Sequence, residues 1–80
     1  MPKLKVLSGS EVIRIFEKFG FLVSTQKGSH VKLQRVTIHG NKQTLTVPKH
    51  DEMDRGTLKA IFNQAVRYIT EEDLRKHFYE

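Results

Sequence analysis

Apolar residues recur at helical spacing near the amino terminus. The positions i, i+3, i+4 and i+7, which share one face of a helix, are Val12, Ile15, Phe16 and Phe19. The stretch Ser8-Gly9-Ser10-Glu11 before them has the spacing of a capping box, in which the serine hydroxyl and the glutamate carboxylate accept backbone N–H groups at a helix start. We therefore expect a helix that begins near residue 9 and ends at Gly20, because glycine adopts the left-handed conformation that terminates helices.

A period of two replaces the helical period after residue 20. Residues 21–26 are rich in aromatic and β-branched side chains, and the bend Lys27-Gly28-Ser29 follows them, so we expect one strand to turn into a second. In the second strand, Val31 and Leu33 share one face of the sheet. The opposite face carries His30, Lys32 and Gln34.

The apolar phase shifts by one residue after this alternation. It continues at Val36 and Ile38, which predicts a bulge or a strand end near Gln34-Arg35. Gly40-Asn41 has the composition of a turn, and residues 43–47 alternate again, with leucine and valine inward and threonines outward, until Pro48 ends the pairing. The sequence therefore predicts three antiparallel strands.

Helical spacing returns in the last third of the chain. A stripe that predicts a helix over about residues 56–68 consists of Leu58, Ile61, Phe62, Ala65 and Ile69. Thr70-Glu71-Glu72-Asp73 has the composition of a new helix start, with acidic residues at the positive end of the helix dipole, so a short last helix carrying Leu74 and Phe78 is expected. Because Phe16, Phe19 and Phe62 lie on helical stripes, we interpret them as core residues rather than base-stacking platforms.

This order of elements predicts an α+β fold of two layers. A helix precedes a three-stranded antiparallel sheet, and a second helix and a short C-terminal helix follow it. The helices cover one face of the sheet and leave the other open. A chain of 80 residues buries roughly 60 to 65% of its unfolded surface, enough for one small core. We therefore expect a single domain over residues 1–80 with one functional site.

The positive charge is concentrated in the middle of the chain. Residues 1–17 contribute +1 to the formal net charge of +5 and residues 51–80 contribute −2, so residues 18–50 carry +6. This middle segment has six basic residues, three histidines and no acidic residue. The asymmetry favours a polyanionic partner, above all nucleic acid, because phosphate neutralisation supplies most non-specific affinity. Lysines kept for solubility are the alternative interpretation.

Two absences narrow the functional classes further. The chain has no cysteine, which excludes disulfides, thiolate nucleophiles and cysteine-based zinc sites. The first residues lack the apolar run of a signal peptide, and no stretch reaches the ~20 apolar residues of a membrane span. We therefore expect a soluble cytoplasmic protein with no membrane partner.

His30 is the residue best suited to chemistry on a nucleic acid. Strand parity places it beside Lys32, directly after a glycine bend whose backbone N–H groups can meet a phosphate. RNA supplies its own nucleophile, the 2′-hydroxyl, so its cleavage needs only a proton acceptor, a proton donor and cations that stabilise the charged phosphorane. An imidazole, which titrates near ~6.5, transfers protons at neutral pH and contributes roughly 10²- to 10⁴-fold to a rate. A structural or merely exposed histidine is the alternative.

The groups that can assist His30 come from three segments. The predicted RNA-binding residues are Lys27, Gly28, Ser29, Lys32, Lys49 and His50. Either His50 or His39 is a candidate for a second proton carrier. No metal or other cofactor is predicted, because the four histidines lack the short spacings of metal ligands. Lys27-Gly28-Ser29 is not a P-loop, since the strand-to-helix setting and the upstream glycine are missing. We interpret the acidic residues 51–54 as a surface loop with helix-start acids.

Several short motifs occur in a fixed order along the chain. They are Ser8-Gly9, Glu17-Lys18-Phe19-Gly20-Phe21, Gln26-Lys27-Gly28-Ser29-His30, Leu45-Thr46-Val47-Pro48-Lys49-His50, Gly56-Thr57-Leu58 with Ile61 and Gln64-Ala65, and Ile69-Thr70-Glu71-Glu72-Asp73-Leu74. In these motifs the chain resembles the HicA-type toxins, the small mRNA-cleaving halves of bacterial and archaeal HicA and HicB toxin–antitoxin pairs. The resemblance covers nearly the whole chain.

This resemblance implies a fold like that of double-stranded-RNA-binding domains. It also implies ribosome-independent mRNA cleavage with His30 as the essential catalytic residue, and a HicB-type antitoxin that covers the site. Two features depart from the family pattern. Val31 stands where many members have a second histidine, and the connection from Arg35 to Lys42 is longer than the expected short turn.

Three functions are consistent with these observations. The leading hypothesis is a metal-independent endoribonuclease toxin. The rival is a non-catalytic RNA-binding module of the same fold, which uses shape and phosphate contacts across an A-form minor groove. The third is a protein with no nucleic-acid role, whose basic face matches an acidic partner protein.

Overall fold

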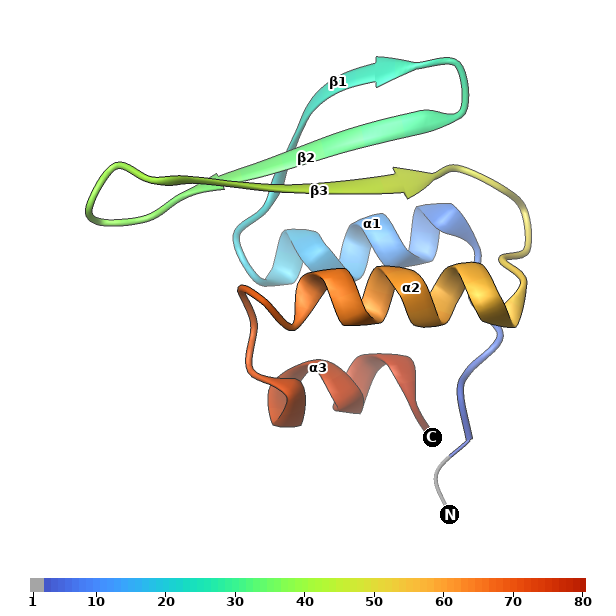
Figure 1. The fold of residues 1–80 in the computed structure, drawn as a ribbon. Helices are drawn as coiled ribbons and strands as arrows, with labels where there is room; N and C mark the ends of the chain where they lie inside the picture. Colours follow the sequence, from blue (N-terminus) through green and yellow to red (C-terminus); the bar gives the residue numbers. More distant parts are fainter. Residues whose placement is uncertain (1–2) are drawn as a thin grey trace.

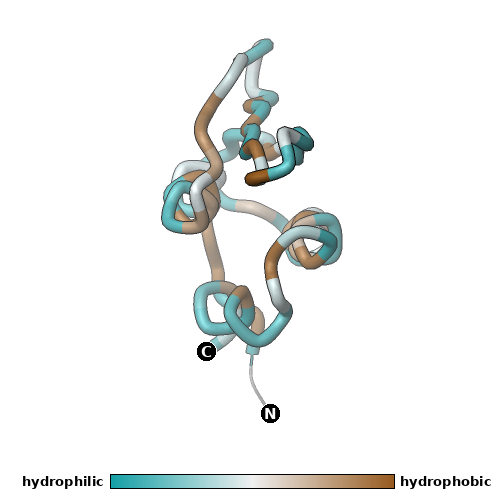
Figure 2. The backbone as a smooth tube through the Cα atoms, turned by 90° about the vertical axis from the view of Figure 1, so that its left-hand side faces the viewer, coloured by the Kyte–Doolittle hydropathy of each residue, from teal (hydrophilic) through white to brown (hydrophobic). Residues whose placement is uncertain are grey.

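The computed structural model describes residues 3–80 and has the predicted order of elements (Figure 1). The elements are α1 (Gly9–Lys18), β1 (Leu22–Lys27), β2 (His30–Val36), β3 (Lys42–Pro48), α2 (Arg55–Ala65) and α3 (Glu71–Phe78). The strands form an antiparallel sheet in the order β1-β2-β3. Helices α1 and α2 lie on one face of the sheet, and α3 lies below them on the side away from the sheet (Figures 1 and 2). The α+β fold, with the element order of a double-stranded-RNA-binding domain, is therefore confirmed.

The helices begin where local chemistry predicts, although α2 ends at Ala65, before the predicted end near residue 68. The Ser8 hydroxyl accepts the backbone N–H of Glu11 at 3.1 Å, and the Glu11 carboxylate accepts the N–H of Ser8 at 2.9 Å, so the capping box is formed. Gly20 follows α1 with a φ of +92°, in the region that favours glycine. The side chains of Asp54 and Thr70 cap α2 and α3 by accepting the backbone N–H groups of Thr57 and Asp73. These caps fix the first residues of the helices from short stretches of sequence.

The hydrophobic core lies between the sheet and the helices and continues down to α3. Phe16 of α1 and Phe62 of α2 both lie against Phe78 of α3, with ring centroids 5.9 and 5.4 Å apart. The sheet contributes four buried side chains to the core, those of Val31, Leu33, Leu45 and Val47. Phe19 is partly buried against the same cluster. The aromatic residues of the helical stripes are thus core residues, as predicted.

The far end of β2 differs from the prediction. The pairing with β3 continues without a register shift, so no bulge occurs at Gln34-Arg35 and the strand continues to Val36. The register shift of the sheet lies in β1 instead, between Val23 and Thr25. Val36 and Ile38 do not enter the core, since 61% and 97% of their surfaces are exposed. The change of apolar phase therefore marks a strand end that projects into solvent.

Arg35 occupies the inward position that alternation would give to an apolar residue. Its guanidinium donates hydrogen bonds to the backbone carbonyls of Phe19 at 2.8 Å and Tyr68 at 2.9 Å. It also donates to the Gln43 side chain at 2.8 Å and lies 4.6 Å from the centroid of the Phe21 ring. These contacts join the C-terminal ends of α1 and α2 to the sheet. They explain why a charged residue follows Leu33 on the helix-facing side.

Candidate functional site

Three segments meet at the end of the sheet where β2 begins (Figure 1). Lys27, the last residue of β1, pairs with His30, and His30 also pairs with Pro48, the last residue of β3. The backbone N–H of Lys49 donates to the carbonyl of Ser29 at 2.6 Å. The bend after β1 and the residues after β3 therefore lie side by side around the first residue of β2.

His30 is exposed on the open face of the sheet. Its neighbour Val31 and the next inward residue, Leu33, are 2% and 0% exposed and face the helices, so strand parity directs His30 and Lys32 outward. Lys27 lies directly opposite His30, where paired Cβ atoms are ~4.5–5.5 Å apart. Lys32 lies two residues farther along the strand, roughly 7 Å away. The imidazole thus has two lysines beside it on the solvent side of the sheet.

The bend before His30 is shaped by a glycine with an unusual backbone conformation. Gly28 has a φ of +61°, and a Cβ atom at this position would have no atom within 4 Å. The Gln26 side-chain amide donates to the Gly28 carbonyl at 3.1 Å and supports the bend. Both Gly28 and Ser29 are exposed. The glycine is therefore required by the turn itself, and the space around the turn is open to a ligand.

His50 reaches the same end of the sheet through a contact with α1. The backbone N–H of Gly9 donates to the His50 carbonyl at 2.8 Å. A Cβ atom at Gly9 would collide with the Pro48 carbonyl oxygen and would lie 2.6 Å from the Lys49 Cα. Only glycine permits this approach of α1 to the segment after β3. Sequence reasoning found the Ser8-Gly9 pair as a helix start and missed this second role.

The other histidines lie elsewhere. His39 belongs to the connection between β2 and β3, at the end of the sheet opposite His30. Because a strand rises about 3.3 Å per residue, the six steps from His30 to Val36 alone span about 20 Å. His77 lies on α3, with its ring 5.4 Å from that of Phe19. His39 is therefore too distant to act as the second proton carrier, and His50 is the candidate that shares an end of the sheet with His30.

Of the acidic residues near the site, Asp54 caps a helix, and Asp51 and Glu52 follow His50 in the sequence. The Asp54 carboxylate accepts the hydroxyl of Thr57 at 2.6 Å and its backbone N–H at 3.1 Å, and these bonds lower the pKa of Asp54. The interpretation of Asp54 as a helix-start acid is thus confirmed. Asp51 and Glu52 are exposed immediately after His50. Within residues 3–80, no group of three or more His, Asp or Glu side chains could hold a metal ion.

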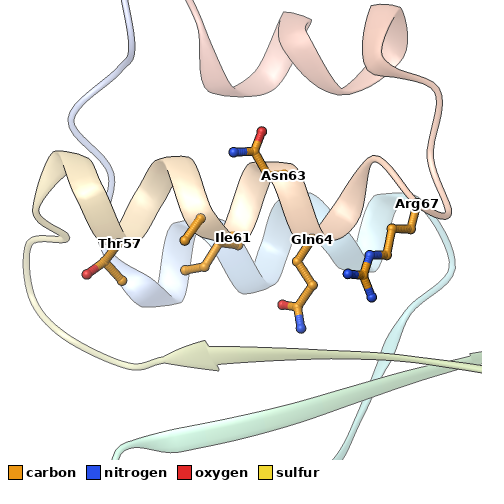
Figure 3. A pocket seen from close by; sticks show the side chains of 6 residues that line it. Thr57, Ile61, Asn63, Gln64 and Arg67 are labelled. Atoms are coloured by element: carbon orange, nitrogen blue, oxygen red, sulfur yellow. The ribbon is translucent and has the colours of Figure 1, made fainter.

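A broad surface hollow lies along α2 and is not lined by His30. It has a volume of about 650 Å³ and is lined by Thr57, Ala60, Ile61, Asn63, Gln64 and Arg67 (Figure 3). None of the predicted site residues lines it. The end of the sheet around His30 instead presents exposed side chains on a projecting bend. Such a surface suits a polymer that lies across it better than a small molecule that must be enclosed.

The comparison with known proteins gives the family of the chain. Residues 9–66 match the family model described as the HicA toxin of bacterial toxin-antitoxin systems. This chain belongs to the HicA toxin family. It is therefore the toxin of a toxin–antitoxin pair and, because HicA toxins cleave RNA, a nuclease. Neither the curated proteins nor the solved structures gave a match to it.

The matched range includes the whole sheet end described above and stops one residue after α2. Helix α3 and residues 3–8 lie outside it, although Leu74 and Phe78 complete the core of this HicA toxin. Among residues 3–80, no helix is long and apolar enough to cross a membrane.

Proposed function

We propose that this HicA toxin is an endoribonuclease that cleaves mRNA without a metal ion, with His30 as its general acid/base. The single observation that carries the proposal is the setting of His30, which is exposed on the open sheet face with Lys27 opposite and Lys32 on the same face. Family membership supplies the reaction class, since HicA toxins cleave RNA. The identity of the RNA and the role of the histidine are our inference.

The proposed chemistry uses the nucleophile that RNA contains. A base takes the proton of a 2′-hydroxyl, the 2′-oxygen forms a bond to the adjacent phosphorus, and the bond from phosphorus to the 5′-oxygen breaks. The leaving 5′-oxygen takes a proton, so the products are a 2′,3′-cyclic phosphate and a 5′-hydroxyl. His30 moves one of these protons, a contribution of roughly 10²- to 10⁴-fold to the rate.

The lysines and the bend stabilise the phosphate as its negative charge grows. Lys27, Lys32 and Lys49 are exposed around His30, and the Gly28-Ser29 bend carries backbone N–H groups beside them. Cations and N–H groups aimed at a phosphorane act most strongly when substrate binding has displaced water from between them. We assign His50 to RNA binding and, as the histidine at this end of the sheet besides His30, to the second proton transfer.

The antitoxin is proposed to inhibit the toxin by covering this surface. The partner of a toxin in such a pair is an antitoxin, and we infer that here it is of the HicB type. An acidic surface is expected on it, because residues 18–50 of the toxin carry six basic residues and no acid. Bound over the sheet end, such a protein excludes RNA from His30.

Expression of histidine variants in growing cells tests the proposal. Wild type and His39→Ala are expected to arrest growth and to cleave mRNA, whereas His30→Ala does neither, and co-expression of the antitoxin restores growth. His39→Ala is the matched control, because it removes an exposed imidazole at the opposite end of the sheet. Purified wild type is expected to retain its activity in excess EDTA. Equal toxicity and equal cleavage by His30→Ala would refute the catalytic role, and RNA binding without cleavage by wild type would indicate a non-catalytic module.

A further inference from the structure

A second basic surface lies outside the site described above, in a groove between the N-terminal segment, α1 and α3. The groove has a volume of about 390 Å³ and is lined by Lys5, Leu7, Glu11, Arg14, Ile15, Lys18 and His77. Backbone hydrogen bonds hold the N-terminal segment beside the end of α3. The N–H of Lys5 donates to the Phe78 carbonyl at 2.8 Å, and the N–H of Glu80 donates to the Lys3 carbonyl at 2.8 Å. Lys5 is thereby fixed next to His77.

The charges in this groove are poorly balanced. Four of the lining side chains are basic and one, Glu11, is acidic. The Glu11 carboxylate already accepts the backbone N–H of Ser8 at 2.9 Å in the capping box, and this hydrogen bond is the main reason that its pKa is lowered. Its negative charge therefore lies at the amino end of α1. Glu11 also interacts with the charge of Arg14, and Lys5 and Lys18 are the further cations that line the groove.

Interaction with helix dipoles accounts for only part of this cluster. Lys18 is in the last turn of α1 and His77 is in the last turn of α3, where cations are favourable. Arg14 lies in the middle of α1 and Lys5 lies outside the helices, so the dipoles explain neither. Burial lowers the pKa of His77, and the charges of Lys18, Lys5 and Lys76 lower it further. These neighbouring positive charges disfavour the protonated form of His77, and a bound anion would relieve that repulsion.

We propose that this groove binds backbone phosphates of the RNA strand beyond the point of cleavage. The inference rests on the proposed function and extends it to the path of the substrate. Helix α1 begins beside the His50 carbonyl, and Lys18 lies nine residues along it, about 13.5 Å away at a rise of about 1.5 Å per residue. At about 3.4 Å per stacked nucleotide, this length corresponds to roughly four nucleotides. A strand that leaves Lys49 and His50 therefore reaches Arg14 and Lys18 within a short distance.

One side of the groove is built by parts of the chain that the family match does not include. Lys5, Leu7 and His77 lie outside residues 9–66, and only the α1 side of the groove lies within them. The C-terminal helix consequently has a role besides completing the core. Helix α3 forms one wall of the groove, and binding in this groove makes long RNA a better substrate than short RNA.

Equilibrium binding of a labelled 12-nucleotide RNA between 50 and 200 mM salt tests the groove. The protein carries His30→Ala, so that the RNA stays intact whether or not wild type cleaves it. The test variant adds Arg14→Gln and Lys18→Gln. The matched control adds Lys59→Gln in α2 and Arg67→Gln just after it, which remove the same charge from exposed positions. Each lost phosphate contact on a single strand reduces the slope of log K against log salt by about 0.7. The slope for the test variant should therefore be smaller by about 1.4 than that of the parent. Over this fourfold change in salt, the factor by which its affinity falls should then be about sevenfold smaller than for the parent.

Equal slopes for the test and control variants would overturn the groove proposal. If Arg14→Gln with Lys18→Gln fails to fold, Lys5→Gln alone should reduce the slope by about 0.7. A purely structural role for the cations predicts a lower melting temperature with an unchanged slope, which also overturns the proposal. Cleavage by wild type is measured separately, so a protein that binds through the groove but does not cut RNA refutes the proposed function and leaves the groove intact.

Discussion

Replacing Arg35 by methionine keeps most of the length of the side chain and removes its guanidinium. Three hydrogen bonds are lost, to the carbonyls of Phe19 and Tyr68 and to the Gln43 side chain, together with the contact over the Phe21 ring. A hydrogen bond to a charged group contributes about 1.5–3 kcal/mol, but the three share one group, and the half-buried carbonyls regain some water. We therefore expect a loss of about 3 kcal/mol in the free energy of unfolding.

A loss of this size is large for a small domain. At about 0.05–0.15 kcal/mol per residue, a chain of 80 residues has a stability of about 4–12 kcal/mol. Since 1 kcal/mol shifts the melting temperature of such a domain by about 4–8 °C, Arg35→Met should lower it by about 12–24 °C. Thermal and urea unfolding followed by circular dichroism measure both quantities.

Two further variants show whether the hydrogen bonds cause the effect. Arg35→Lys keeps the charge but cannot reach the three acceptors with one planar group, so it should recover less than half of the loss. Lys32→Met removes a cation from the exposed face of the same strand and should change stability by about 0.5 kcal/mol or less. If Arg35→Met costs less than about 1 kcal/mol, the joining of the two helix ends through Arg35 is not a major source of stability.

The remaining predictions concern the contact between α1 and the site, and pH. Gly9→Ala forces the backbone apart at Pro48 and Lys49, so we expect the free energy of unfolding in urea to fall by about 1–3 kcal/mol and RNA cleavage to become slower. The control Ser10→Ala should change neither quantity. A Gly9→Ala protein with unchanged stability and cleavage rate would contradict the close approach. Because the pKa of His77 is lowered in the folded protein, the unfolded chain binds a proton at this residue first as pH falls. The stability that neutral His77 contributes is therefore fully present above the unfolded pKa of about 6.5 and is lost as pH falls through the lower pKa of the folded state. Melting temperatures between pH 5 and 8 should therefore fall on the acid side for wild type and fall less for His77→Gln, and identical profiles would contradict this assignment.

Much of the fold follows from local patterns in the sequence. The capping box at Ser8 and the apolar stripe of α1 are short-range features, and hydrogen bonds within a few residues decide them. Strand parity likewise predicted that His30 and Lys32 face away from Val31. These features could be predicted because each depends on residues that are near one another in the chain.

Contacts between distant segments account for the features that sequence did not predict. The shift of the apolar phase to Val36 and Ile38 predicted a bulge or a strand end near Gln34-Arg35, whereas carbonyls at the ends of two helices hold Arg35 inward and the pairing continues to Val36. His39 and His50 were equivalent candidates in the sequence, and the backbone contact from Gly9 to His50 distinguishes them. The basic groove combines residues from both ends of the chain, so the charge of each segment alone gave no sign of it.

The rate of cleavage of one defined RNA by purified protein, under single-turnover conditions at saturating enzyme, tests the role of His30 most directly. We predict that His30→Ala slows this step by about 10²- to 10⁴-fold, while His39→Ala cleaves at the wild-type rate. Because saturation removes differences in binding, the ratio reports the proton-transfer step alone. A His30→Ala rate equal to that of His39→Ala would contradict general acid/base catalysis by this residue.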